Sequence, residues 1–391
     1  MSPSFPFGNV GPLLMKTDTF GHSFRHIYEY FKARNQAVGG YYFVLKPELI
    51  IVDVELIKCI LTKDFTNFMD RGTYIDEQND PLSAHLFALP GVKWKALRAK
   101  LTPTFTSGKM KMMFPTLVAC SGQMEELLEN LSRHAEPIDM KDILARFTID
   151  VIGSCAFGID CNSMTDPDNE FRKFGIASFN IKGFDAVRQI LVIIFPKLMQ
   201  FLRYPGISPK ISTFFMNVVK STVSYREKNN IQRNDFLQLL LNIKNQEHKE
   251  RGETESTDTN ARLTLDQIAA QCFVFFLAGF DTSSTTMTFS LFEMASNQEI
   301  QDKVRDELVT VLKKYNGQLT YEAIMELHYL DKVICGLRFG LMQTKVGLAV
   351  ILKNFKCSVN GKTKLPIVMS PESFMTTPEG GIWLDLHKIT S

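Results

Sequence analysis

The sequence predicts a mainly α-helical protein with a small β lobe, an α+β fold class, and two observations lead to that prediction. Between about residues 82 and 315, apolar residues recur mostly at helical spacing, as in Met124–Leu131 and Phe236–Ile243. Runs typical of strands occur near residue 40 and again after Leu352. We therefore expect a helical body with strands in two short regions.

The first of these regions is GGYYFVLKPELIIVD, residues 39–53. Two β-rich runs flank Lys46-Pro47-Glu48, which predicts a hairpin that turns at these three residues. Asp53 follows the second run and is suited to cap a helix over Val54–Leu61. Residues 37–62 are thus predicted to form a β hairpin plus a helix.

The helical body is predicted to span residues 82–334. Turns within it are signalled by Pro103, Pro115, Pro137, Pro205 and Pro209. The polar stretch NQEHKERGETESTDTN, residues 245–260, has almost no apolar side chain to contribute to a core. We expect a solvated connector there, which separates two helical blocks of the same domain.

The C-terminal region, residues 337–391, is predicted to hold one helix followed by short strands. Asn360-Gly361 lies between FKCSV and KTKLPIV, and this dipeptide is typical of a tight hairpin turn. We therefore expect these two runs to pair with each other.

Composition excludes some classes of function. The net charge is +2 and the basic residues are scattered, which argues against a nucleic-acid-binding protein. Apolar residues make up 45% of the chain, with 31 Phe and 17 Met. This composition is typical either of a protein with a cavity for apolar ligands or of one with a Phe-rich core. The seven cysteines show no paired metal-finger spacing, as is usual in a reducing compartment.

The N-terminal twenty residues lack the pattern of a signal peptide, and no stretch reaches the length of a membrane span. A shorter apolar run covers residues 190–202. We favour a buried helix interrupted by Pro196 for this run. The alternative is a segment that dips into the surface of a bilayer.

The helix expected over Leu265–Ala295 is unusual in its middle. Its apolar flanks predict burial, yet Ala278, Gly279, Asp281 and Thr282 place small and polar groups at its centre. Glycine costs a helix about 1 kcal/mol relative to alanine, and a buried carboxylate costs more unless it is paired. These residues could let a flat ligand lie against the backbone while Thr282 bonds a carbonyl one turn earlier and loosens the helix. A core helix with a polar patch is the simpler alternative.

The stretch FFLAGFDTSSTT resembles the oxygen-binding central helix of the cytochrome P450 haem-thiolate monooxygenases, whose pattern is Ala/Gly-Gly-x-Asp/Glu-Thr. Further matches to the insect microsomal, detoxification-type branch follow in the same order. They are FPFGNVGPL near the start, WKALR at 94–98, FTIDVIGSCAFG at 147–158 and LRFGLMQTKVGL at 337–348. The resemblance implies one P450-like domain over residues 1–391.

The resemblance also implies an activity and its partners. Family members insert one oxygen atom from O2 into a lipophilic substrate, use haem (iron protoporphyrin) as cofactor, and take electrons from NADPH through a cytochrome reductase. They work at the cytoplasmic face of the endoplasmic reticulum membrane. In the family, a membrane helix precedes the FPFGNVGPL segment, and we find no such anchor in this sequence.

Site residues follow from the same resemblance. Asp281 and Thr282 would manage proton delivery, and Ala278 and Gly279 would make room for dioxygen. Trp94 and Arg98 stand at i, i+4, which places them on one helix face, where the resemblance implies contact with a haem propionate. Lysines 93, 95 and 100 nearby suit an acidic electron-transfer partner or equally a solvated helix face.

Cys335 departs from the family pattern. The family holds its iron through a cysteine in the loop Phe-x-x-Gly-x-Arg-x-Cys-x-Gly, whereas YLDKVI precedes Cys335, and Gly336 follows it directly. No Glu-x-x-Arg occurs in the chain. We infer that a segment holding that helix, a meander and the ligand loop is missing before Gly336. We therefore interpret Cys335 as a structural cysteine at a helix end, and a metal-ligand role for Cys335 remains the alternative.

This departure leaves three hypotheses for function. We favour a cytochrome P450-like monooxygenase that is impaired in this chain. The alternatives are a catalytically silent truncated product and a haem-free helical carrier of apolar ligands. The missing segment also predicts that apolar surface over Leu337–Leu352 is left exposed.

Overall fold

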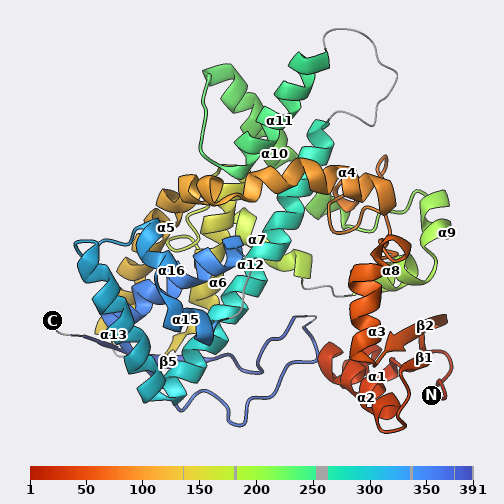
Figure 1. The fold of residues 1–391 in the computed structure, drawn as a ribbon, viewed down its shortest axis with the longest axis horizontal. Helices are drawn as coiled ribbons and strands as arrows, with labels where there is room; N and C mark the ends of the chain where they lie inside the picture. Colours follow the sequence, from red (N-terminus) through yellow and green to blue (C-terminus); the bar gives the residue numbers. More distant parts are fainter. Residues whose placement is uncertain (135, 180–182, 252–262, 335–337, 374, 390–391) are drawn as a thin grey trace. The chain divides into compact units, whose positions relative to one another are not determined.

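The computed structural model describes residues 1–134, 136–179, 183–251, 263–334, 338–373 and 375–389. The chain divides into two compact units. The first comprises Met1–Leu97, Phe179–Ser212 and Met369–Thr377; the second comprises Arg98–Ser178, Thr213–Val368 and Pro378–Ser391. Most elements are helices (Figure 1), which confirms the predicted mainly α class with a small β part.

The first unit combines short helices with a two-stranded sheet. Its elements are α1 (Gly11–Leu14), α2 (Phe20–Lys32), β1 (Val38–Phe43), β2 (Lys46–Ile51), α3 (Val54–Lys58), the π-helix Cys59–Lys63, the 3-10 turns Phe65–Asn67 and Pro81–Ser83, α8 (Phe184–Ile194) and α9 (Pro196–Phe201). A small core of Val10, Ile27, Phe31 and Val44 holds α2 against this sheet.

The predicted hairpin exists, but the predicted turn is wrong. Lys46, Pro47 and Glu48 belong to β2, where Pro47 pairs with Tyr42. The turn is made earlier, at Val44 and Leu45, with Val44 at a φ of 57°. Proline is tolerated in β2 because both strands of a two-stranded sheet are edges. The Asp53 cap is confirmed, since its side chain accepts a hydrogen bond from the Leu56 amide.

The second unit holds most of the helices. Its elements are α5 (Ser107–Arg133), β3 (Ile138–Asp139), α6 (Met140–Ile152), the π-helix Gly153–Phe157, α7 (Glu170–Phe179), α11 (Phe236–Arg251), α12 (Leu265–Ser296), α13 (Gln298–Lys314), α14 (Tyr321–Met325), α15 (His328–Val333), α16 (Arg338–Asn354), β4 (Phe355–Val359) and β5 (Trp383–Lys388). Two further helices, α4 (Gly91–Leu101) and α10 (Pro209–Asn229), cross the division between the units.

The strand pairing after Leu352 differs from the prediction. β4 pairs with β5 in antiparallel register, with Val359 opposite Leu384, and β5 pairs in turn with β3. Asn360 does begin a turn, because its carbonyl accepts from the Thr363 amide. The Asn360 side chain, however, donates to both carboxylate oxygens of Asp385 at 2.9 and 3.0 Å. These contacts tie the turn to β5, so the expected hairpin with KTKLPIV is wrong.

Not every predicted turn at a proline is present. Pro115 lies inside α5 rather than at a turn. A proline within a helix removes one backbone hydrogen bond, but the surrounding residues Met113, Phe114 and Leu117 are buried, and their packing offsets that loss. Pro209, by contrast, is the first residue of α10, where a missing N–H costs nothing.

The polar stretch at residues 245–260 is partly helical. α11 continues to Arg251, so the first residues of the stretch extend a helix instead of forming a connector. Residues 252–262 lie outside the described part of the chain.

The central helix prediction is confirmed. α12 runs from Leu265 to Ser296 and begins with a capping box, in which Thr264 and Gln267 bond each other's backbone amides. Thr282 does bond the Ala278 carbonyl, as expected, but the helix stays continuous there. The cyan ribbon of α12 in Figure 1 shows this long unbroken path.

The expectation that apolar surface of Leu337–Leu352 is exposed is wrong for the residues described. From Met342 to Leu352 every residue of α16 is buried, and its apolar side chains join the main core of the second unit. α16 packs against α5, α12 and α13, so other helices already cover the surface that we expected to be open.

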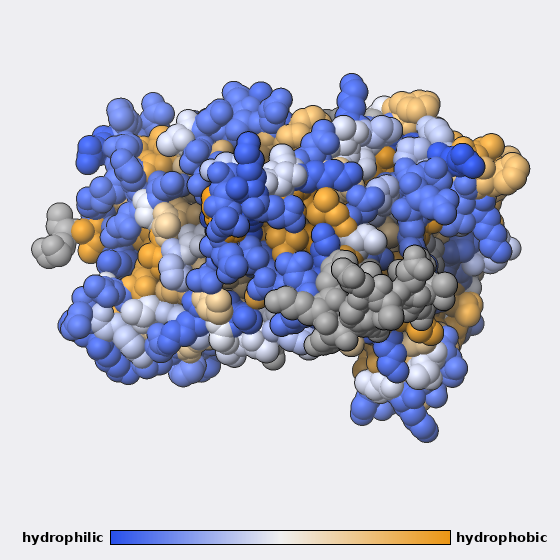
Figure 2. All heavy atoms as spheres, turned by 90° about the horizontal axis from the view of Figure 1, so that it is seen from above, coloured by the Kyte–Doolittle hydropathy of each residue, from blue (hydrophilic) through white to orange (hydrophobic). Residues whose placement is uncertain are grey.

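The apolar run at residues 190–202 is interrupted as predicted but is only partly buried. α8 ends at Ile194 and α9 begins at Pro196. Val192 and Met199 are buried, whereas Phe201 is 83% exposed. Figure 2 shows one face of the molecule, where apolar residues emerge among the prevailing hydrophilic ones. No helix among the described residues is both long and apolar enough to cross a membrane.

A buried ion pair joins α15 to α16. Lys345 is 1% exposed, and its ammonium lies 2.6 Å from a carboxylate oxygen of Asp331 and 3.1 Å from the Ile324 carbonyl. A buried ammonium needs an anionic partner, so this pair holds the two helices together on either side of residues 335–337.

Replacing Asp331 by Asn should lower the free energy of unfolding by about 2 kcal/mol, because the buried Lys345 ammonium then loses its anionic partner and keeps only neutral oxygen acceptors. Denaturant melts of the purified protein measure this loss. Asp306→Asn, at an exposed position of α13, is the matched control and should change stability by less than about 0.5 kcal/mol. Equal losses in the two variants would contradict the role assigned to the pair.

Candidate functional site

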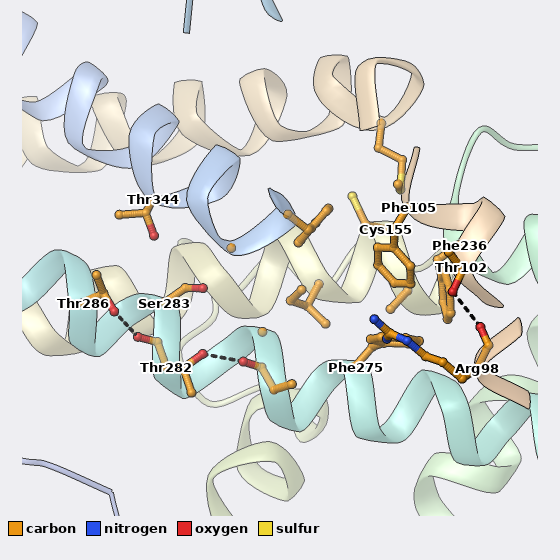
Figure 3. A pocket seen from close by; sticks show the side chains of 17 residues that line it. Arg98, Thr102, Phe105, Cys155, Phe236, Phe275, Thr282, Ser283, Thr286 and Thr344 are labelled. Carbon is orange, nitrogen blue, oxygen red and sulfur yellow. Dashed lines mark hydrogen bonds between the residues drawn. The ribbon is translucent and has the colours of Figure 1, made fainter. Parts of the chain in front are cut away.

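A pocket of about 720 Å³ lies among the helices of the second unit (Figure 3). The residues that line it come from α4 to α6, from the turns that follow α4 and α6, and from α11, α12 and α16. They are Arg98, Thr102, Phe105, Met113, Ile152, Cys155, Ala156, Phe236, Phe275, Ala278, Gly279, Thr282, Ser283, Thr286, Phe339, Gly340 and Thr344. A volume of this size is typical of sites for small molecules.

One face of α12 forms a long wall of this pocket. Ala278, Gly279, Thr282, Ser283 and Thr286 follow one another at alternating steps of one and three residues, which places them on the same side of the helix. Gly279 and Thr282 therefore both lie on the face of α12 that lines the pocket.

The hydroxyl groups of this wall are mostly occupied within the helix. Thr282 donates to the Ala278 carbonyl, and Thr286 donates to the Thr282 carbonyl at 2.9 Å. Such bonds satisfy a threonine hydroxyl without a ligand. Figure 3 draws both of them as dashed lines.

Gly279 is required by packing as well as by the pocket. A Cβ atom at this position would lie 2.5 Å from Cδ1 of Ile152, which belongs to α6 and also lines the pocket. A larger residue at this position would force the Ile152 side chain to move, because the distance is shorter than any normal carbon–carbon contact. Glycine destabilises an isolated helix, but at this position it lets α12 and α6 approach each other closely.

Three phenylalanines form the apolar end of the pocket. The ring centroids of Phe236 and Phe275 are 4.3 Å apart at an interplanar angle of 81°, and Phe105 lies 5.7 and 5.1 Å from them. Edge-to-face rings of this kind make a rigid wall that suits a flat or elongated apolar ligand. Sequence analysis did not single them out, because 31 Phe are spread along the chain and nothing marks these three.

Asp281 is not among the pocket residues. Its carboxylate accepts a hydrogen bond of 2.7 Å from the Lys141 ammonium, which also reaches Ser284 at 3.0 Å and Thr285 at 2.5 Å. Burial lowers the pKa of Lys141, and the Asp281 carboxylate opposes that shift. The pair satisfies the buried acid on α12. Lys141 could not be identified as its partner from the sequence, because the two residues are 140 positions apart and meet only in the folded chain.

Arg98 and Trp94 have different surroundings. Arg98 lines the pocket, and Figure 3 shows its side chain extending into it. Trp94 is absent from the lining, and its ring contacts Phe65 edge-on at 5.6 Å. The two residues share α4, as predicted, but only Arg98 belongs to the pocket wall.

No residue in the described lining of the pocket is suited to supply a thiolate ligand. Cys155 lines it, but complete burial raises the pKa of this thiol far above its usual value, which keeps it protonated. Cys335 lies outside the described residues. Within residues that are described, no cluster of three or more His, Cys, Asp or Glu is arranged to hold a metal ion.

Comparisons with known proteins identify close relatives. The profile of the family "Cytochrome P450" matches residues 2–335. The chain is 34% identical to "Probable cytochrome P450 6a20" of Drosophila melanogaster, over 99% of this chain and 93% of that protein. It is 44% identical to "Probable cytochrome P450 6a18" of the same species, over 96% and 90%. It is 33% identical to "Cytochrome P450 6A1" of Musca domestica, over 99% and 92%.

These alignments are longer than the chain itself. The alignment with the first relative extends over 476 positions, although the chain has 391 residues, so at least 85 of its positions have no residue from this chain. The family profile matches this chain only up to Cys335. The alignment with the first relative, by contrast, covers 93% of that relative's length.

Replacing Lys141 by Met should destabilise the protein by about 3 kcal/mol, because the Asp281 carboxylate would be left buried without a cation. Calorimetric or denaturant melts measure the loss. The double variant Lys141→Met/Asp281→Leu should recover much of it, since no buried charge remains.

Lys303→Met serves as the control for this experiment, because its partner Glu299 is exposed and such pairs contribute little. A double variant that is less stable than Lys141→Met alone would show that the pair is not the source of the effect.

Proposed function

This chain belongs to the cytochrome P450 family, and we propose that its pocket binds a lipophilic substrate while the family's monooxygenase reaction is impaired in it. The family consists of haem-dependent monooxygenases that insert one atom of O2 into lipophilic substrates, with electrons from a reductase. The proposal rests on comparing the pocket with the three contacts that haem requires. These are flat apolar surface, a cation for a propionate and a thiolate for the iron.

The pocket meets part of that requirement. Phe105, Phe236 and Phe275 offer flat apolar surface, and Arg98 offers a cation for a propionate. An iron-bound thiolate is the part that we do not find among the described residues, since Cys155, the cysteine in the described lining, lies within the π-helix Gly153–Phe157 and not in a glycine-bearing loop that turns amide groups toward its sulfur. The described residues therefore do not fit haem as an axially ligated group, and we derive no catalytic step through it.

The length of the alignments supports the same interpretation. The at least 85 positions without a counterpart and the end of the family match at Cys335 agree with a missing segment between Cys335 and Gly336. In the family this region would carry the Glu-x-x-Arg helix and the ligand loop. We propose that Cys335 is a structural cysteine next to the junction and not a metal ligand.

The remaining site residues receive roles on the same basis. Ala278 and Gly279 would let a ligand lie against α12, and Thr282 would be the hydroxyl nearest to it. Asp281, held by Lys141, would position this part of the helix. Trp94 would support Arg98 through α4 without touching the ligand.

A second candidate is a haem-free carrier of apolar ligands. It is favoured by the pocket itself, whose aromatic walls are formed entirely within one unit and need no metal to hold them. A third candidate is a catalytically silent truncated product, which would share the fold but would neither oxidise substrates nor carry apolar ligands.

The proposal extends to location and partners. We propose that the chain acts at the cytoplasmic face of the endoplasmic reticulum and that NADPH-cytochrome reductase is the electron donor of its full-length relatives. Lysines 93, 95 and 100 on α4 provide basic groups for an acidic partner, although Lys93 is paired with Glu77 and Lys100 also has an interaction within the protein.

Purified protein supplied with haem should show no thiolate carbon-monoxide band when reduced, and no turnover of lipophilic substrates with reductase and NADPH. The reason is that a protonated or displaced thiol is a poor axial ligand. Absorption spectra with carbon monoxide measure the first point, and Cys335→Ser should leave them unchanged. Stoichiometric haem with the thiolate band, abolished by Cys335→Ser, would overturn the impairment.

Membrane contact is proposed for α8 and α9. Phe184 is 73% exposed, Phe201 is 83% exposed, and Leu198 and Leu202 are also exposed. Helical segments that present such apolar side chains bind bilayer surfaces in proportion to the apolar area they bury.

The double variant Phe184→Asp/Phe201→Asp should bind phospholipid vesicles at least about tenfold more weakly, because two aromatic side chains lose their burial in the interface. Flotation with vesicles of phosphatidylcholine and phosphatidylserine measures this. Val309→Asp, at an exposed apolar position of α13, should bind like the unmodified protein. If all three proteins float equally, α8 and α9 do not contact the bilayer.

A further inference from the structure

The two-stranded sheet of the first unit has one edge that is covered near its turn. β1 and β2 pair with each other in antiparallel register (Figure 1). On the outer side of β1, the Tyr42 carbonyl accepts a hydrogen bond from the Asn9 amide, and the Tyr42 amide donates to the Asn9 side chain, both at 2.8 Å. Gly8 also forms a β-bridge with Phe43. The N-terminal residues therefore occupy this part of the β1 edge.

The outer edge of β2 is open. Because the Tyr42 backbone groups point away from β2, those of Pro47, which is opposite Tyr42, point away from β1. The alternation of an antiparallel ladder extends this outward direction to Leu49 and Ile51. In the part of the chain that the structure describes, neither backbone has a hydrogen-bond partner. An unpaired edge of this kind is a template for a further strand.

The open edge accepts a partner only at one end. Near the turn, Pro47 has no N–H to donate, and the Lys46 ammonium is already 2.6 Å from a Glu48 carboxylate oxygen. Lysine and proline on an edge strand are features that oppose pairing. Leu49 and Ile51, at the other end, carry free amides, and the Leu49 side chain is 71% exposed. A partner strand therefore has to match a short apolar edge.

A second copy of β2 matches this edge. When two copies run antiparallel with Ile50 opposite Ile50 of the second copy, Leu49 lies opposite Ile51 of the second copy, and Ile51 opposite Leu49. Both of these pairs exchange their N–H···O bonds through backbone groups that are free in one copy. Every cross-strand pair is apolar, which stabilises the pairing of strands.

This register is the best one available to two copies of β2. A register centred on Leu49 would place Pro47 opposite Ile51 of the second copy, where a hydrogen bond is lost because proline has no N–H. It would also place Glu48 opposite Ile50. The sequence of β2 thus favours the register that leaves Pro47 outside the contact.

We propose that β2 is a dimerisation edge, at which two copies of this chain join their hairpins into one continuous antiparallel sheet. Both copies use the same edge, so the contact is symmetric and closes at two chains. Further growth would need the β1 edge, where Asn9 already holds Tyr42 and where Gly39 and Gly40 offer no side chain to pack. The inference goes beyond the proposed function, because the pocket lies in the second unit.

Sedimentation velocity of the full chain, without haem or lipid and over a range of concentrations, tests the proposal. We expect a monomer–dimer equilibrium. Leu49→Pro removes the outward N–H and leaves every hydrogen bond to β1 in place, so it should weaken the dimer at least about tenfold. Val54→Pro is the matched control, since proline is tolerated at the first position of α3, and it should dimerise like the unmodified protein.

Charged variants test the register. Residue 49 of one copy faces residue 51 of the other, so the variant Leu49→Lys/Ile51→Lys brings like charges together, whereas Leu49→Lys/Ile51→Glu brings opposite charges together. The first should dissociate at least about fivefold more readily than the second. Circular dichroism melts verify that each variant is folded. If Leu49→Pro does not fold, hydrogen exchange of the Leu49 amide in the unmodified protein replaces it, and exchange should slow as concentration rises.

The remaining outcomes contradict the proposal. A monomer at every concentration overturns it, and so does a dimer that Leu49→Pro leaves intact or that Val54→Pro weakens equally. Equal dissociation of the two charged variants overturns the register and the inference with it. An oligomer that is lost in Phe184→Asp/Phe201→Asp but kept in Leu49→Pro is held by α8 and α9 instead of β2. The carbon-monoxide spectrum decides the proposed function separately, because dimerisation is measured without haem.

Discussion

The close approach of α12 to its neighbours is the constraint on which the second unit depends. A Cβ atom at Gly279 would lie 2.5 Å from Ile152 of α6, and one at Gly347 of α16 would lie 2.6 Å from Met287 of α12. Both contacts are with side-chain atoms, Cδ1 of Ile152 and Sδ of Met287, so a larger residue at either glycine would force a neighbouring side chain to move. The pocket lies along the same helix, and Gly279 and Ile152 are both in its wall. Its shape therefore depends on how closely α6 and α16 pack against α12.

The same packing determines which polar groups of α12 are structural. Asp281 faces α6, where Lys141 satisfies it, and so the acid stabilises the contact between the two helices. Thr282 and Ser283 face the pocket instead. Because helix geometry sends adjacent residues about 100° apart, one step along the chain separates a group held by the protein from a group open to a ligand. The polar patch on this helix thus serves both packing and binding.

The sequence predicted the fold class and the central helix well, because both depend on long periodic patterns. Predictions that depended on a few residues were less successful. Pro115 lies within α5 since the packing of that helix outweighs one lost hydrogen bond, and Asn360 is drawn to Asp385 of β5, which follows 25 residues later. The same difference between periodic patterns and individual contacts is seen in the site. Gly279 and Thr282 could be placed from helical spacing, whereas Lys141 and Thr344 approach α12 only through tertiary packing.

The burial of α16 bears on how the pocket is held in place. α16 begins at Arg338 and contributes Phe339, Gly340 and Thr344 to the pocket wall. The Lys345–Asp331 ion pair joins it to α15, which ends at Val333. The wall that α16 forms therefore depends on two kinds of contact within the second unit, the apolar packing against α5, α12 and α13 and this ion pair. A pocket that is built in this way keeps its walls through packing and needs no bound group to hold them.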